Sequence, residues 1–377
     1  MTGPATLVCK SFANLTDPRV DRGHNHDLHE MIFIALTAAI CGANSWADVE
    51  RFAKAKRPWF ERYLDLPEGI PSHDTFTRVF ARLDTAEFLT AMHAWVDRLA
   101  TSLRGKGVAI DGKVLRGSFD RASGQSPLHT LTAFATESRL VLRQMSVDDK
   151  SNEILAVPEL LKLIDLAGAV VTLDAMHCQK ETARAVIDAG ADYLLTVKGN
   201  RGNLAARLVE LFIEYGEANY RVDGLRHQAT LEKSHGREER RDYYTIAVPD
   251  EPIFSDWKGV KTIGMVYRHR EGGVKEHDEN TFFISSLPPK VKRIGRLLQG
   301  HWSIENSQHY VLDVTFAEDA SRIRTGNGPE ISAAFRRMAL NVLQRDTTLK
   351  DSIRGKRLSL GWDDDALDRL YAGFRAG

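Results

Sequence analysis

Apolar residues recur at helical spacing through the first 105 residues of the chain. Between positions 28 and 36 they follow the i, i+3, i+4 rule, and Asp27 stands where a helix N-cap is expected. The same reasoning predicts further helices at 45–57, from Ser72 and at 88–99. We therefore expect residues 1–105 to form an all-helical N-terminal domain.

Near residue 107 the period changes, and short apolar runs replace the helical spacing. The runs GVAI, VVTL and DYLLTV predict buried strands, and the alternating pattern over 129–148 predicts a hairpin. Helices are expected between and after these strands, at 151–166, 179–189 and 203–219. This order of strands and helices predicts an α/β fold with a mixed sheet.

Residues 225–290 follow a third pattern, in which short strands such as DYYTIAV and NTFFISSL alternate with polar turns. We expect a β-rich insertion here, inside the α/β unit, followed by helices at 290–310 and roughly 330–345. The predicted organisation is a helical domain over 1–105 and an α/β domain over 106–377 that carries the insertion and a helical C-terminal part.

The composition is that of an ordinary folded protein, with 377 residues of which 43% are hydrophobic and 27% charged. The 51 basic residues equal the 51 acidic ones, so only segregated patches, and not the average charge, could attract nucleic acid. Cys9, Cys41 and Cys178 are odd in number and far apart, which argues against a disulfide framework or a paired-cysteine zinc site. No signal peptide or membrane span is predicted, so the cytoplasm is the expected location.

Two aspartates follow apolar strands in the same way, Asp111 after GVAI and Asp174 after VVTL. Chemistry in α/β sheets gathers beyond the carboxyl ends of such strands, where an acid can face a bound ion without lying among apolar side chains. The alternative is that each aspartate only caps the turn that follows it.

A third acid, Glu305, lies in the run GHWSIENSQHY on an expected helix. His301, Glu305 and His309 stand at i, i+4 and i+8 and would share one helix face. This spacing alone is compatible with zinc, but the sequence HExxH is absent, and carboxylates favour Mg²⁺ or Mn²⁺. Taken alone, Glu305 could equally be an ordinary surface residue.

Blocks spread over nearly the whole chain resemble an insertion-sequence transposase of the class named for its Asp-Asp-Glu (DDE) triad. They are FANLTDPR, GIPSHDTFTRVF, IDGKVLRGS, VDDKSNEILAVPELL, VVTLDAMHCQ, DYLLTVKGN, HGREERR and HWSIENSQHYVLDVTFAEDASRIR. The blocks occur in the family's order, and the group that they resemble includes the H-repeat-associated (ISAs-type) proteins.

The resemblance implies a ribonuclease-H-like catalytic fold in which Asp111, Asp174 and Glu305 form the catalytic triad. It also implies two Mg²⁺ ions, for which Mn²⁺ can substitute. We expect Asp111 to bridge both ions and Asp174 and Glu305 to hold one each. The implied reaction is cleavage of DNA at the ends of the insertion element, followed by transfer of the freed 3′-hydroxyl end to target DNA. The nucleophiles are water and that hydroxyl, so no Ser or Tyr nucleophile is assigned.

Related enzymes often carry an Arg four residues before the Glu and a Lys seven residues after it. Here those positions hold His301 and Leu312, so His301 is expected to contact phosphate in place of the Arg, and the Lys has no equivalent. The other candidates for DNA contact are basic or polar residues near the triad or in the insertion, each of which could instead be an ordinary solvated side chain. They are Lys113, Arg116, Lys198, Asn200, His235, Arg237, Arg240, Arg241, Arg322 and Arg324.

The helix after Ser72 presents His73, Thr75, Thr77 and Arg78 on its early turns, where a recognition helix would make groove contacts. The N-terminal domain is therefore a candidate for binding DNA ends, although Ser-capped helices occur in any bundle.

The expected partners are double-stranded DNA, as terminal inverted repeats and as target, and a second copy of the chain on that DNA; no membrane is expected. Two other functions stay open. One is a degenerate copy that binds DNA without cutting it, and the other is a metal-dependent nuclease of similar fold without a joining step.

Overall fold

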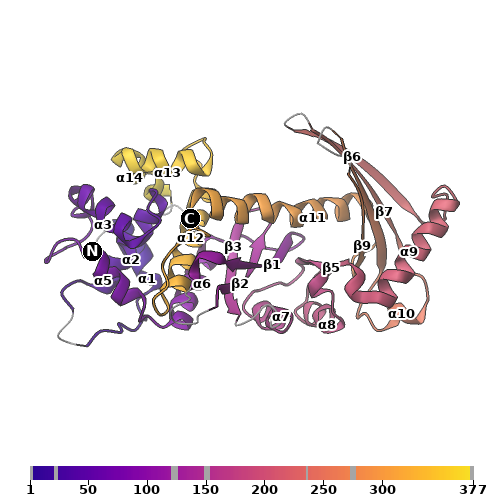
Figure 1. The fold of residues 1–377 in the computed structure, drawn as a ribbon, viewed down its shortest axis with the longest axis horizontal. Coiled ribbons are helices and arrows are strands. Elements are labelled where there is room, and N and C mark those ends of the chain that lie inside the picture. Colours follow the sequence, from indigo (N-terminus) through magenta and orange to yellow (C-terminus); the bar gives the residue numbers. More distant parts are fainter. Residues whose placement is uncertain are drawn as a thin grey trace.

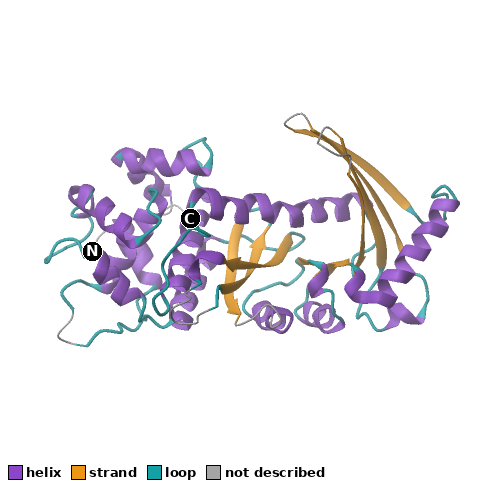
Figure 2. Ribbon diagram, in the orientation of Figure 1, coloured by secondary structure: helices purple, strands orange, loops and turns teal. Residues whose placement is uncertain are grey.

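The computed structural model describes residues 3–20, 24–119, 126–147, 153–234, 237–271 and 277–373. Figure 1 shows an elongated molecule with a helical block at one end and a tall, curved group of strands at the other. Between them lies a sheet with helices on both faces, which Figure 2 shows by secondary structure. No helix within the described ranges has both the length and the apolarity that a membrane crossing needs.

Six helices form the N-terminal region, as the apolar spacing predicts. They are α1 (Gly3–Ser11), α2 (Leu28–Ile40), α3 (Trp46–Ala55), α4 (Arg57–Phe60), α5 (His73–Phe80) and α6 (Thr85–Leu99). The side chains of Asp27, Ser45, Ser72 and Asp84 accept backbone N–H bonds at the starts of α2, α3, α5 and α6. Helix α2 is buried along almost its whole length, because the other helices of the block surround it.

Three C-terminal helices complete the same block: α12 (Gly328–Arg345), α13 (Ile353–Trp362) and α14 (Asp364–Gly373). The hydroxyls of Thr37 and Tyr371 share a hydrogen bond of 2.7 Å. The guanidinium of Arg357 donates to the carbonyl of Ala39 at 3.0 Å. The two ends of the chain are thus packed into one helical body, as Figure 1 shows.

A nine-stranded sheet has the order β3-β2-β1-β4-β5-β9-β8-β7-β6. Its strands are β1 (Gly107–Leu115), β2 (Leu128–Ala135), β3 (Leu140–Val147), β4 (Val170–Leu173), β5 (Asp192–Val197), β6 (Arg226–Ser234), β7 (Arg237–Ala247), β8 (Thr262–Glu271) and β9 (His277–Ser285). Strands β1, β4 and β5 run parallel, and every other neighbouring pair is antiparallel. The predicted mixed α/β class is therefore confirmed.

The β-rich segment expected at 225–290 is present as β6–β9, and it extends the central sheet. Its last strand, β9, pairs with β5 from Leu194↔Ser285 to Val197↔Phe282. The four added strands therefore continue the sheet that carries the two aspartates, and do not form a separate unit.

Helices cover both faces of the sheet. On one face lie α7 (Glu153–Lys162) and α8 (Lys180–Asp188), and on the other lies the long α11 (Val291–Ile304). Helix α9 (Gly202–Glu217) and the short α10 (Pro252–Ser255) accompany the far strands. After α11 the chain continues through two π-helical turns, Glu305–His309 and Val311–Thr315. Glu305 is thus held beside the sheet by a helix that packs along it.

Candidate active site

Asp111 lies on β1, and Asp174 directly follows the parallel strand β4. The register of β1 and β4 ends with Ile110 opposite Leu173, so each aspartate comes directly after one member of this last pair. Because adjacent strands lie about 4.8 Å apart, the two aspartates start from neighbouring backbones. The prediction that both acids follow their strands holds for β4 only, because β1 continues past Asp111 to Leu115 in its pairing with β2.

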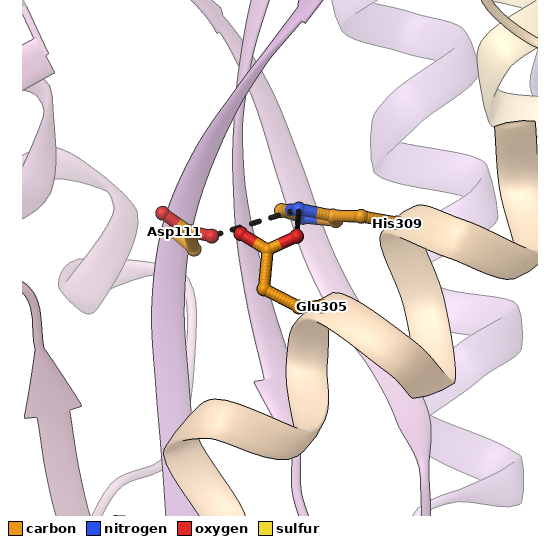
Figure 3. A group of neighbouring side chains, drawn as sticks. All are labelled: Asp111, Glu305 and His309. Carbon is orange, nitrogen blue, oxygen red and sulfur yellow. Dashed lines mark ion pairs between the residues drawn. The ribbon is translucent and has the colours of Figure 1, made fainter. Parts of the chain in front are cut away.

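Glu305 approaches Asp111 together with a histidine from the same π-helical turn. The Nδ1 atom of His309 lies 3.6 Å from Oδ2 of Asp111 and 3.5 Å from Oε2 of Glu305 (Figure 3). One possible ligand atom from each of these three side chains lies within 4.8 Å of the other two. The structure therefore brings two of the three predicted acids together, and it adds His309, which was predicted only to share the helix face.

Asp174 lies outside that group of three and is held by His301. The Nε2 atom of His301 lies 3.3 Å from Oδ1 of Asp174, and its Nδ1 atom lies 2.9 Å from the hydroxyl of Thr172. The imidazole is buried, whereas the Asp174 side chain is 55% exposed. His301 is thus committed to Asp174, and the expectation that it takes over the phosphate contact of an Arg does not fit this geometry.

The charges of the three acids and of the two histidines shift the pKa values of the acids. Burial raises the pKa of Asp111 to about 6; His309 and His301 oppose this rise, and the negative charges of Asp174 and Glu305 add to it. The hydrogen bond from His301 lowers the pKa of Asp174, and His309 lowers that of Glu305. Asp111, Glu305 and His309 bring carboxylate oxygens and an imidazole nitrogen together, with Asp174 nearby, and a divalent cation would neutralise the carboxylate charges, so the donor set fits a metal ion.

Lys113, predicted to contact DNA, instead belongs to a buried ion-pair network. Its side chain is only 8% exposed, and its ammonium pairs with Asp313 and lies 3.2 Å from Glu318. Glu318 is itself fully buried and pairs with Arg337 at 2.7 Å. These carboxylates pair with Lys113 within the protein, so the structure gives it a structural role, and its contact with DNA stays a prediction.

A buried carboxylate behind the site, Glu153, was not predicted. Its Oε1 atom lies 3.3 Å from His129 and its Oε2 atom 3.9 Å from His177, in the turn that follows Asp174. A Cβ atom on Gly112 would lie 1.9 Å from Oε1 of Glu153. The sequence signal was the glycine directly after Asp111, since a carboxylate can pass so close to a strand only where no side chain stands.

The other candidates near the triad divide into anchored and exposed residues. Asn200 donates to the carbonyl of Ala175 at 2.7 Å and so holds the turn after Asp174. Lys198 is exposed, and its charge helps to lower the pKa of Asp174. Arg116 is 85% exposed, 4.0 Å from Asp319.

The predicted basic cluster of the insertion is largely neutralised by carboxylates. Arg240 pairs with the buried Asp242 at 2.7 Å. Arg241 pairs with Glu232 at 2.8 Å and lies over the ring of Trp302, 5.6 Å from its centroid. His235 and the side chain of Arg237 lie outside the described residues.

A cleft of about 440 Å³ lies between α3, α5 and the segment 317–325 that follows the second π-helical turn. His73 and Thr77 of the predicted recognition helix line it, and so do Arg322 and Arg324. Both arginines are exposed, and Arg324 also donates to the carbonyl of Gly117 at 3.1 Å. Two groups of predicted DNA contacts, distant in sequence, therefore face one cleft.

Comparison with known families decides the assignment. The profile described as "Transposase DDE domain" matches residues 103–342, and the one described as "DDE_Tnp_1-associated" matches residues 9–96. The chain belongs to the DDE transposase family. The predicted family and the function of a DNA transposase are thereby confirmed.

Relatives of this transposase match it over most of their length. "Putative transposase YncI" of Escherichia coli O157:H7 is 37% identical over 357 residues, which cover 92% of this chain and 90% of that protein. "H repeat-associated putative transposase YhhI" of Escherichia coli K12 is 36% identical over 354 residues, covering 92% and 93%. Among solved structures, a piggyBac transposase synaptic complex with hairpin DNA matches 99% of this chain and 76% of that one, with 10% identity and a TM-score of 0.46.

Proposed function

We propose that this transposase cuts DNA at the ends of its own insertion element and joins the freed 3′-hydroxyl to target DNA, with Asp111, Asp174 and Glu305 as the catalytic triad. The convergence of Asp111 and Glu305 from a strand and a distant helix carries the proposal. Asp174 supports it, because it directly follows Leu173, whose register partner Ile110 directly precedes Asp111.

We further assign the strands β3-β2-β1-β4-β5 to a ribonuclease-H-like core. Strands β3, β2 and β1 are antiparallel to their neighbours in this group, and β1, β4 and β5 are parallel to one another. Helix α11 packs along these strands and leads into Glu305. Strands β6–β9 are then the β-rich insertion, joined to this core through β5 and β9.

Two Mg²⁺ ions are the proposed cofactors, with Mn²⁺ as a substitute. The charges of Asp174 and Glu305 both act on the carboxylate of Asp111, so we assign Asp111 to both ions, and Asp174 and Glu305 would hold one each. When bound, such ions activate the attacking oxygen and stabilise the leaving one. His301 keeps Asp174 oriented through its two hydrogen bonds, Glu153 packs against Gly112 of the strand that carries Asp111, and Lys113 on that strand pairs with Asp313.

Double-stranded DNA is the proposed partner, held by exposed residues on both sides of the triad. Lys198 lies beside Asp174, and Arg116 lies five residues along the chain from Asp111, roughly 15 Å in an extended strand. Beyond Arg116, the cleft lined by Arg322, Arg324 and helix α5 would receive the element's end. Joining two ends to a target favours a dimer on DNA, acting in the cytoplasm on the bacterial nucleoid.

The test uses a supercoiled plasmid that carries the inverted repeats flanking the gene. With Mg²⁺, the purified protein should nick the plasmid at the repeat ends and then transfer those ends into a second plasmid. Binding without nicking would identify a DNA-binding protein that no longer cuts, and nicking without transfer would identify a nuclease. Either of these results would overturn the proposal.

A further inference from the structure

We propose that His309 is a metal ligand of this transposase, so that one divalent ion is held by Asp111, Glu305 and the Nδ1 atom of His309. The inference rests on the proposed function, because it concerns the same metal centre, and it adds a nitrogen ligand to the three acids.

The ligand atoms of the three side chains converge at distances close to those between ligands of one metal ion. The Nδ1 atom of His309 is aimed at both carboxylates, at 3.6 and 3.5 Å, which exceeds the usual length of an N–H···O hydrogen bond. Ligands of an octahedral ion with bonds of about 2.1 Å lie roughly 3 Å apart when adjacent and roughly 4.2 Å apart when opposite. The group of three, with its atoms within 4.8 Å of one another, needs only small movements to reach such distances.

The imidazole of His309 is buried, and its Nδ1 atom faces the carboxylates of Asp111 and Glu305. Its side chain is 9% exposed, and it lies on the π-helical turn that begins with Glu305. Turns of this kind are frequent at functional sites. The Nε2 atom is buried, and no group in the described ranges hydrogen-bonds to it. If Nε2 carries the imidazole proton, a lone pair remains on Nδ1, on the side of the two carboxylates.

His301 offers a contrast within the same helix and serves as a control. Both of its nitrogens are engaged, Nδ1 with Thr172 and Nε2 with Asp174. It is therefore a positioning residue for Asp174, whereas His309 is free to contribute a ligand atom.

A nitrogen ligand changes which ions the site prefers. Imidazole suits transition-metal ions better than it suits Mg²⁺ or Ca²⁺, which prefer oxygen. We therefore expect this transposase to bind Mn²⁺ more tightly than Mg²⁺, and we expect His309→Gln to weaken Mn²⁺ binding about tenfold while changing Mg²⁺ binding less.

The test is electron spin echo envelope modulation of Mn²⁺ added to the full chain without DNA. Wild type and His301→Gln should show the modulation of a directly bound ¹⁴N, and His309→Gln should lose it. His309→Glu should recover Mn²⁺ affinity without the nitrogen signal, because it restores a ligand with an oxygen donor. Circular dichroism of each variant establishes that it is folded, and His309→Asn serves as a second variant if His309→Gln is not.

A nitrogen signal that persists in folded His309→Gln or His309→Asn, or that is missing from wild type with Mn²⁺ bound, would overturn the inference. Asp111→Asn separates this failure from that of the proposed function. If Asp111→Asn abolishes Mn²⁺ binding but wild type shows no nitrogen signal, only the role of His309 fails. If Mn²⁺ binding is indifferent to Asp111→Asn, the proposed metal centre itself is wrong.

Discussion

The ammonium of Lys113 pairs with the carboxylate of Asp313, 200 residues later in the chain. This ion pair ties the strand of Asp111 to the helical segment of Glu305, two residues beyond Asp111 on one side and eight beyond Glu305 on the other. Glu318 joins the same network from the loop that follows. The distance between the two acids is thus set partly by an ion pair between the buried Lys113 and the partly exposed Asp313.

Lys113→Met should destabilise the protein, because it leaves the fully buried Glu318 with one partner fewer. Breaking a buried ion pair by removing one member costs about 3 kcal/mol, measured here by urea denaturation. Arg116→Ala is the matched control, since this exposed side chain should change stability by less than about 0.5 kcal/mol. Unchanged stability in Lys113→Met with weaker DNA binding would restore Lys113 as a DNA contact.

Gly112→Ala should disturb the site directly. Its Cβ atom would lie 1.9 Å from Oε1 of the buried Glu153, so the carboxylate or the strand of Asp111 must move. Overpacking of this kind costs about 1–3 kcal/mol in the free energy of unfolding. Gly202→Ala, with nothing within 4 Å of the added carbon, should leave stability almost unchanged. Equal denaturation midpoints for the two variants would contradict the close approach of Glu153.

The raised pKa of Asp111 predicts a pH dependence of folding stability. Its protonated form is favoured in the folded protein, so the stability it contributes is complete below pH 4 and is lost as pH rises through about 6. Without metal, the unfolding free energy of wild type relative to Asp111→Asn should fall by about 2 kcal/mol between pH 4 and pH 7. Thermal denaturation of both proteins across this range checks the sign, and a difference independent of pH would refute it.

Metal binding should show the opposite trend with pH. A carboxylate must be deprotonated to hold an ion, so Mn²⁺ affinity should fall as the pH drops below about 6. Isothermal titration calorimetry at pH 5 and pH 7 measures this difference directly. Equal affinities at the two values would remove Asp111 from the ligand set.

Arg322→Gln should weaken binding to the element's end and reduce its salt dependence. The side chain is exposed in the cleft beside helix α5, and each lost phosphate contact lowers the slope of log K against log salt by about 1. Fluorescence anisotropy at several salt concentrations provides the slope. Arg57→Gln is the control, because Arg57 is also exposed but forms an i, i+4 ion pair with Glu61. A slope equal to that of wild type would exclude the cleft from the DNA interface.

Local patterns predicted the elements well because they depend on neighbours in sequence. The N-terminal helices begin at polar caps such as Ser72, and β4 ends just before Asp174, as the apolar runs indicate. Glu305 was a candidate from its sequence context, and the family blocks then grouped it with Asp111, which no periodicity could do. Its place beside Asp111 depends on how α11 lies across the sheet.

Features that depend on tertiary packing could not be predicted from the sequence. From the sequence, Lys113 is expected to be a solvated cation, because only the fold brings Asp313 and Glu318 next to it. From the sequence, Arg240 is expected to contact phosphate, but in the structure it pairs with the buried carboxylate of Asp242. The place of His309 beside Glu305 follows from their i, i+4 spacing, but its approach to Asp111 depends on how the π-helical turn lies against the sheet.

The central claim is that Asp111, Asp174 and Glu305 act together on DNA. The most direct measurement is single-turnover cleavage of DNA that carries the element's end, by Asp111→Asn, Asp174→Asn and Glu305→Gln, with exposed Glu61→Gln as control. Each triad variant should lose cleavage by about a thousandfold or more, since each removes a ligand of the metal centre, while end binding stays within a few-fold of wild type. Cleavage by Glu305→Gln at the wild-type rate would contradict the account.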